Sequence, residues 1–185
     1  MRVRSRPGLM AAAIAVAALL VGAPRATAQV VVSMPNTDQS TTFTASVAEQ
    51  VTITVPTAVS FTVNNIGIDT VATNAAVSAT NIVMSAAGRA LKISLKADAA
   101  GFTSPVAGET YDAADVIWNA STWTSGVGAS GTLSSAAYTE IATCTADATG
   151  CSTADLAFTL KAHAGVAYAG DHTLDATWKI ESVVP

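Results

Sequence analysis

Apolar and polar residues alternate one by one in short segments along most of the chain. Residues 42–47 read Thr-Phe-Thr-Ala-Ser-Val, and residues 51–55 read Val-Thr-Ile-Thr-Val. Because successive side chains of a β-strand point to opposite faces, this pattern predicts strands with one apolar and one polar face. The alternation recurs at residues 59–63, 82–84, 91–95, 156–160 and 174–180. The chain is therefore expected to contain at least seven strands.

Turn-forming residues separate these segments. Glycine, proline and asparagine lie between most of them, at spacings that suit short antiparallel connections. Half of the residues are hydrophobic (50%) but only 5% are aromatic, a composition typical of a threonine- and valine-rich β-protein. The sequence predicts an all-β fold, an antiparallel two-sheet β-sandwich of Ig-like or jelly-roll-like type, with a small β-barrel as the alternative.

The apolar members of the alternating segments form the predicted core. They are Val51, Ile53, Val55, Phe61, Leu91, Ile93, Leu95, Leu156, Phe158, Leu160, Trp178 and Ile180. Residues 72–79 come nearest to a helical pattern, but their Thr, Val and Ser content fits a loop or an edge strand at least as well.

The amino terminus has the features of a secretory signal peptide. Arg2, Arg4 and Arg6 precede an uncharged apolar run, which ends at the small-x-small cleavage site Ala26-Thr27-Ala28. The run is shorter than the roughly 20 residues that span a bilayer. We expect a signal peptide over 1–28, an arm with the first strand over 29–48 and a β-sandwich domain over 49–185, with no membrane span in the mature chain.

Cleavage would leave an acidic protein. The mature chain keeps five basic side chains against 13 acidic ones, a net charge of −8 instead of −4. Such a surface repels phosphate backbones, so nucleic acid and anionic membranes are not expected as partners. The acidic residues are scattered, which favours a role in solubility.

Cys144 and Cys151 lie in the sequence Cys-Thr-Ala-Asp-Ala-Thr-Gly-Cys. In an exported protein an isolated pair predicts a disulfide, here one that staples a hairpin or a surface loop. The spacing is not that of a C-x-x-C redox motif, and no second pair completes a zinc site.

Few residues are candidates for chemistry. A hydrolase would need His163 or His172 beside a nucleophile and a carboxylate, but the sequence has no G-x-S-x-G motif. His172 and Asp175 would point to opposite faces of a strand. We therefore expect no catalytic residues, no cofactor and no enzyme activity.

Two groups of acidic residues were weighed as cation sites. They are Glu109 with Asp112 and Asp115, and Asp147, within the cysteine loop, with Asp155, which follows it. Calcium needs six to eight oxygen ligands, and the DxDxDG loop is absent, so we expect solvated loop carboxylates and no metal site.

Trp118 and Trp123 are candidates for a stacking platform. Aromatic faces can hold sugar rings, which makes a carbohydrate-binding module the alternative function. That function predicts that both indoles, with Tyr111 or Tyr138, are exposed and coplanar. In a sandwich, tryptophan more often belongs to the core.

Two segments carry a resemblance of style. Thr-Thr-Phe-Thr-Ala-Ser-Val-Ala-Glu-Gln-Val-Thr-Ile-Thr-Val-Pro (41–56) and Gly-Asp-His-Thr-Leu-Asp-Ala-Thr-Trp-Lys-Ile-Glu-Ser-Val (170–183) follow a signal peptide. The chain thereby resembles the secreted β-sandwich subunits of bacterial surface fibres and spore-coat or pilin-like proteins. It departs from chaperone–usher pilins in its local cysteine pair and its Ser-Val-Val-Pro end.

The resemblance implies a non-catalytic secreted or cell-surface structural or adhesion protein. Its partners would be further copies of the chain, other surface proteins or a polysaccharide. The arm over residues 30–47 is expected to add a strand to a sheet edge, either within its own chain or in a neighbouring subunit.

Overall fold

The structure is a computed structural model that describes residues 40–146 and 148–185. The chain divides into two units, Met1–Thr44 and Ala45–Pro185, and the second holds every strand of the described residues. The expected signal peptide (1–28), residues 29–39 of the expected arm and Asp147 lie outside the described residues.

The strands form three sheets. Sheet A has the order β1-β3-β10, sheet B the order β2-β11-β5-β8 and sheet C the order β12-β4-β9-β7-β6. The bounds in sheet A are β1 (Gln50–Thr54), β3 (Ala75–Val83) and β10 (Gly150–Leu156). Those in sheet B are β2 (Thr70–Val71), β11 (Phe158–Leu160), β5 (Val116–Trp118) and β8 (Gly131–Thr132). Those in sheet C are β12 (Ala176–Val183), β4 (Ala90–Ala97), β9 (Thr139–Cys144), β7 (Gly126–Gly128) and β6 (Thr122–Trp123).

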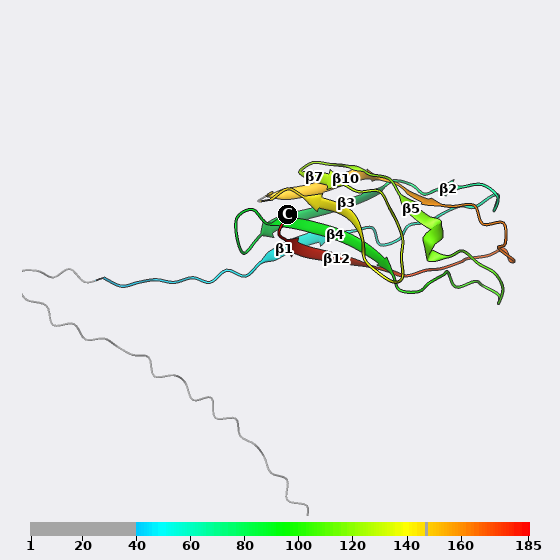
Figure 1. Cartoon of the computed structure of the whole chain (residues 1–185), viewed down its shortest axis with the longest axis horizontal. Helices are drawn as coiled ribbons and strands as arrows, with labels where there is room; N and C mark the ends of the chain where they lie inside the picture. The colour runs from blue at the N-terminus through cyan, green and yellow to red at the C-terminus, as the bar shows by residue number, and fades with distance from the viewer. Residues whose placement is uncertain (1–39, 147) are drawn as a thin grey trace, which may run out of the picture. The chain divides into compact units, whose positions relative to one another are not determined.

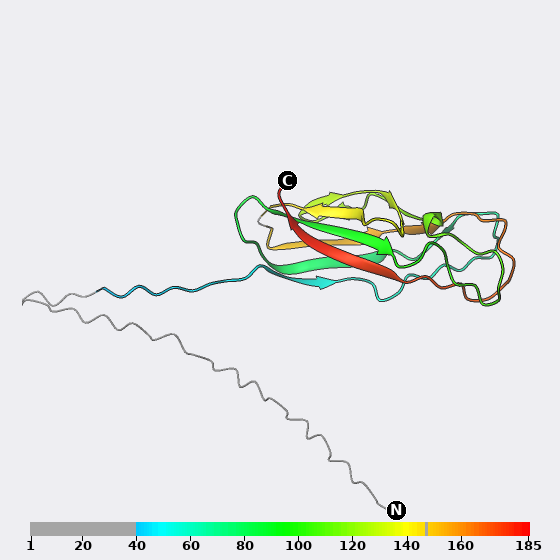
Figure 2. The ribbon, with the colours of Figure 1, turned by 60° about the horizontal axis from the view of Figure 1, so that its bottom comes forward.

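Every pairing is antiparallel, and the only helical element of the described residues is a 3-10 turn, η1 (Ala113–Asp115). Sheets A and B follow one another along one layer, because only Ala157 separates β10 from β11. The strands of sheet C form the facing layer (Figures 1 and 2). The prediction of an all-β sandwich is confirmed, and none of the sheets closes into a barrel.

Half of the predicted core is fully buried. Leu91, Ile93 and Leu95 of β4 are at most 4% exposed, and Leu156, Phe158 and Leu160 at most 3%. The other six predicted residues are only partly buried, although they pack against the same core: Val51, Ile53, Val55, Phe61, Trp178 and Ile180. The partly buried residues lie on the edge strands β1 and β12 or, as Val55 and Phe61, in the strand-free chain after β1.

Three expectations about strands are wrong. Residues 42–47 and 59–63 form no strand, and Phe43 is 93% exposed. Alternation predicts which side chains would share a face of a strand, but it does not show that a second strand is available for pairing. In the described residues, no strand pairs with either segment. Residues 75–79 do form a strand, but in the centre of sheet A, where Ala75, Val77 and Ala79 are buried.

The predicted disulfide is confirmed, but its position differs from the expectation. Cys144 ends β9 in sheet C and Cys151 lies in β10 of sheet A, with the two Cα atoms 5.9 Å apart. Both cysteines are at most 1% exposed. The bridge therefore joins the two layers within the core and does not staple a surface loop.

Among the described residues, no helix has the length and apolarity needed to cross a membrane.

Candidate functional site: the seam between the two edge strands

Strands β1 and β12 lie next to each other at one edge of the sandwich without pairing. Glu49, directly before β1, accepts a hydrogen bond from the Ser182 hydroxyl of β12 at 2.9 Å. Its carboxylate also lies 3.5 Å from the Arg89 guanidinium, which donates to the hydroxyl and carbonyl of Ser182. The two strands belong to different sheets, and each is an edge strand of its sheet.

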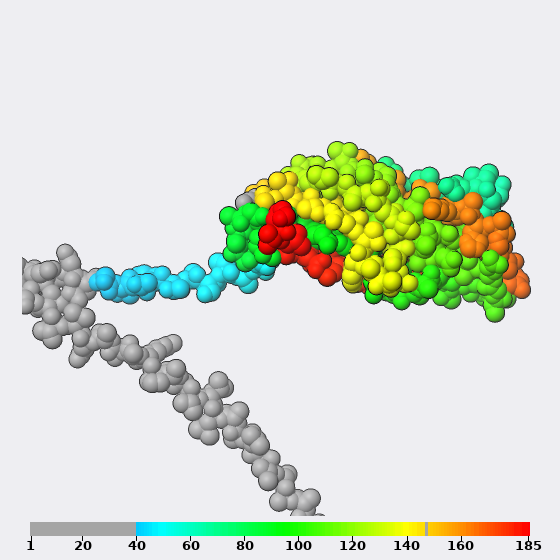
Figure 3. Space-filling view, viewed as in Figure 1, coloured from blue at the N-terminus to red at the C-terminus, as the bar shows by residue number. Residues whose placement is uncertain are grey.

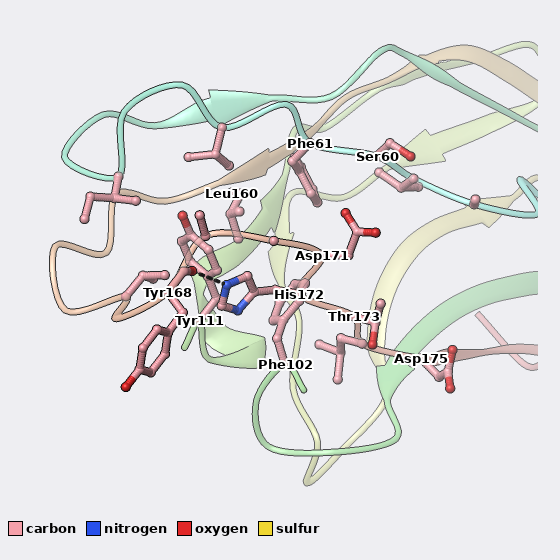
Figure 4. Close-up of a pocket in the computed structure, with 18 of the residues that line it drawn as sticks. Ser60, Phe61, Phe102, Tyr111, Leu160, Tyr168, Asp171, His172, Thr173 and Asp175 are labelled. Carbon is pink, nitrogen blue, oxygen red and sulfur yellow. Dashed lines mark hydrogen bonds between the residues drawn. The ribbon is translucent and has the colours of Figure 1, made fainter. Parts of the chain in front are cut away.

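Farther along, the chain after β1 and the chain before β12 line a common pocket of about 880 Å³. One wall is residues 57–66 and the other is residues 166–175, with Phe102, Tyr111 and Leu160 between them. Figure 4 shows Phe61 on the first wall and Asp171 and His172 on the second. We call β1, β12 and these two walls together the seam.

Apolar side chains along the seam are incompletely covered. Val51 and Ile53 of β1 and Trp178 and Ile180 of β12 are only partly buried, while Val77 of β3 and Ile93 of β4 are at most 1% exposed. Phe61 and Leu174 at the pocket are also only partly buried. In the space-filling view, β12 (red) lies at the surface of the molecule (Figure 3). The core thus remains accessible along this edge.

Two histidines hold the second wall of the pocket in place. His163 Nδ1 lies 2.7 Å from a carboxylate oxygen of Asp115, and Nε2 lies 3.3 Å from Glu109. His172 Nε2 donates to the Tyr168 carbonyl at 2.9 Å, and its Nδ1 lies 2.6 Å from the Thr110 hydroxyl. Because both histidines bind residues 109–115, the loop between them is tied to that segment at two points.

The ring of Tyr111 separates the two imidazoles. Its centroid lies 5.8 Å from each, in edge-on geometry, and the side chain is 4% exposed. Burial raises the pKa of Tyr111, and the negative charge of Asp115 adds to this. Hydrogen bonds to Asp115 and then Glu109 raise the pKa of His163 above its ordinary value.

Neither histidine combines the groups that a hydrolase needs. His163 contacts two carboxylates but no hydroxyl, whereas His172 contacts a hydroxyl and a carbonyl but no carboxylate, in the hydrogen bonds of the described part of the chain. These hydrogen bonds therefore orient a loop. They do not link a nucleophile, a histidine and a carboxylate as in a catalytic triad.

The acidic residues weighed as cation sites have other partners. Glu109 and Asp115 meet at His163, and the Asp115 carboxylate also accepts from the backbone N–H of Asp112. Asp155 accepts from the backbone N–H of Thr122 and from the Thr153 hydroxyl, and these bonds, the one from Thr153 foremost, lower its pKa. Within residues 40–146 and 148–185, no three His, Cys, Asp or Glu side chains are grouped to hold a metal ion.

Trp118 and Trp123, the candidates for a stacking platform, both lie in the core. Trp118 and Trp123 are 3% and 6% exposed, and their indole N–H groups donate to the Ala129 carbonyl and the Ser121 hydroxyl. Tyr111 is also buried, and only Tyr138, at 38%, is exposed. The exposed rings that a carbohydrate-binding module would need are therefore not supplied by Trp118, Trp123 and Tyr111.

The seam was not foreseen. Phe61 and Trp178 were expected in the core, and residues 166–171 carried no expectation. Its one sequence signal is the strand-free stretch between the alternating segments that become β11 and β12.

No protein-family model, curated protein or solved structure matches this chain.

Proposed function

We propose that the mature protein is a non-catalytic, secreted structural protein of the cell surface, whose subunits associate when the amino-terminal arm of one adds a strand to another. The observation that carries this proposal is the state of residues 40–49. All ten residues are exposed and none of the ten belongs to a strand, although residues 42–47 have a strand's alternation.

This segment presents apolar surface that the chain itself leaves uncovered. Phe43 and Val47 are 93% and 76% exposed and lie on the same face of an extended segment. Burial of apolar area contributes about 25 cal/mol per Å², so covering these two side chains favours association. A strand with a free edge supplies the backbone partners that such a segment lacks.

The chain after the arm disfavours pairing within the same molecule. For residues 40–47 to pair with the adjacent β1, the chain would have to reverse at Ala48-Glu49. Two-residue hairpin turns require positive φ angles and favour Asn-Gly or Gly-containing pairs. Glu49 is also fixed by bonds from the Ser85 backbone N–H and the Ser182 hydroxyl. A neighbouring subunit is therefore the better acceptor.

The alternative of a carbohydrate-binding module loses the feature that suggested it. Its two tryptophans are buried, so we do not carry it forward.

Sedimentation velocity of the chain from Gln29 onwards, over a range of concentrations, tests the proposal. We expect oligomers that grow with concentration. Phe43→Asp with Val47→Asp should yield a monomer, because it places charge on the apolar face of the arm. The matched control, Thr42→Asp with Thr44→Asp, adds the same charge to the opposite face and should still associate. A wild-type chain that stays monomeric, or an equal loss in both variants, would refute self-association through the arm.

A further inference from the structure

The seam has the form of an acceptor for one additional strand. Resting on the proposed function, we propose that residues 40–47 of one subunit occupy the seam of the next subunit, paired antiparallel with the outer edge of β12. The arm would then lie between β12 and β1 and cover the partly exposed core side chains.

The lengths agree. Residues 40–47 and β12 (Ala176–Val183) each comprise eight residues. The outer edge of β12 has no strand partner in the described residues, while its inner edge pairs with β4 over its full length. An added strand would therefore meet an edge without a bulge, on which, in the described part of the chain, only the Ser182 carbonyl is already bonded, to Arg89.

The side chains also match in the register that aligns the two segments end to end. Phe43 then lies opposite Ile180, Ala45 opposite Trp178 and Val47 opposite Ala176. Trp178 and Ile180 face the core, so all apolar residues of the arm would face it too. The smallest side chain of the arm meets the largest of β12, which suits close packing of cross-strand neighbours.

The polar face of the arm would remain in solvent. In the same register Thr44 lies opposite Lys179 and Thr42 opposite Glu181. Lys179 is already paired with Glu181 at 2.6 Å on the outer face of sheet C, so no unpaired charge becomes buried. We assign the antiparallel direction, because antiparallel pairs are slightly more stable than parallel ones.

Such a contact joins two different surfaces of the subunit. The arm is the segment before β1, whereas the acceptor is the outer edge of β12, so the two surfaces differ and neither is self-complementary. A contact of this heterologous kind generates an open chain of subunits when the rotation between them does not close. The partner of the seam is thus a second copy of this chain.

Mixing single-cysteine variants tests the assignment. Thr44→Cys mixed with Lys179→Cys should form a disulfide-linked dimer under mild oxidation, because the two positions face each other across the proposed pair. The matched control mixes Thr44→Cys with Val127→Cys, which is 74% exposed on β7 of the same sheet and should not link. The native disulfide is buried and would not exchange with these thiols.

A second pair of mixtures reads the direction of the arm. Thr42→Cys should link to Glu181→Cys in the antiparallel arrangement and to Thr177→Cys in a parallel one. Oligomers that form without the Thr44–Lys179 link would overturn the seam assignment and leave the proposed function standing. A chain that remains monomeric would overturn both.

Discussion

His163 binds carboxylates that lie 48 and 54 residues before it in the sequence, and so its charge is coupled to folding. Its pKa is raised in the folded protein, chiefly by the hydrogen bond to Asp115. A raised folded pKa contributes stability that is complete below the unfolded value of 6.5 and is lost as the pH rises through the folded value.

We therefore expect the stability difference between wild type and His163→Gln to be largest below pH 6.5 and to shrink as the pH rises above that value. Urea unfolding of both proteins over a series of pH values measures it, and subtraction removes the titrations that both share. A difference that is independent of pH would show that the imidazole does not gain charge over that range.

Phe158 is the residue at which truncation should cost most. It is 3% exposed, and its ring meets Trp118 edge-on with centroids 6.1 Å apart. Phe158→Ala should lower the free energy of unfolding by about 3–5 kcal/mol, through lost burial and the cavity left behind. Val127→Ala, at a 74% exposed position, is the control and should change it by less than about 0.5 kcal/mol. Similar unfolding midpoints for the two variants would contradict the described burial.

For single residues, the sequence predicted burial better than it predicted contacts with residues far away in the chain. Alternation placed Leu91, Ile93 and Leu95 in the core, because facing is a local property of a strand. It did not indicate that Glu109 and Asp115 meet at His163, since that contact depends on how distant loops pack.

Strands β6 and β7 depend on a close approach of backbones. At Gly128, an added Cβ would overlap the backbone carbonyl oxygen and N–H of Ser121. Gly128→Ala should therefore displace the β6–β7 pair and lower stability. At Gly150, in β10, the nearest atom to an added Cβ is the Ala79 carbonyl oxygen at 3.7 Å, an ordinary contact. Gly150→Ala is the matched control and should leave thermal unfolding nearly unchanged. Equal effects in the two variants would contradict this packing.

Sequence patterns located the elements unevenly. β4 and β12 follow strong alternation of large apolar residues, and both were predicted. β3 was not, because Ala75 and Ala79 carry little apolar contrast against Ser78 and Thr80, and its burial comes from strands on both sides. Residues 42–47 show the reverse case, in which a strong pattern has no partner strand within the described chain.

At the scale of the whole molecule, the predicted signal peptide determines which residue should be the first of the mature protein. Mass spectrometry of secreted protein should find Gln29 as the first residue and no thiol that can be alkylated before reduction, because Cys144 and Cys151 are bridged. An intact Met1 or two free thiols would contradict secretion through this signal.

Truncation separates folding from assembly. Removing residues 29–47 should abolish association but leave the free energy of unfolding unchanged, because residues 40–47 are exposed and lie outside every strand. The sequence alone led us to expect that a deletion through Val47 would open a core face, and the exposure of Phe43 and Val47 removes the basis for that expectation. Chemical denaturation and sedimentation of the truncated chain test the two effects separately, and a loss of stability would indicate that the arm packs on its own subunit.

The bridge between β9 and β10 also affects the order of folding. Cys144 and Cys151 are only seven residues apart in the sequence, yet they lie in strands of opposite layers. Once the disulfide has formed, the unfolded chain already holds the end of β9, from sheet C, against the start of β10, from sheet A. The search for the arrangement of sheet on sheet, normally the slow, nonlocal part of building a sandwich, then begins from a fixed pivot. Strand β1, which is the strand farthest from this pivot in sequence, would be among the last to be placed, and it borders the seam.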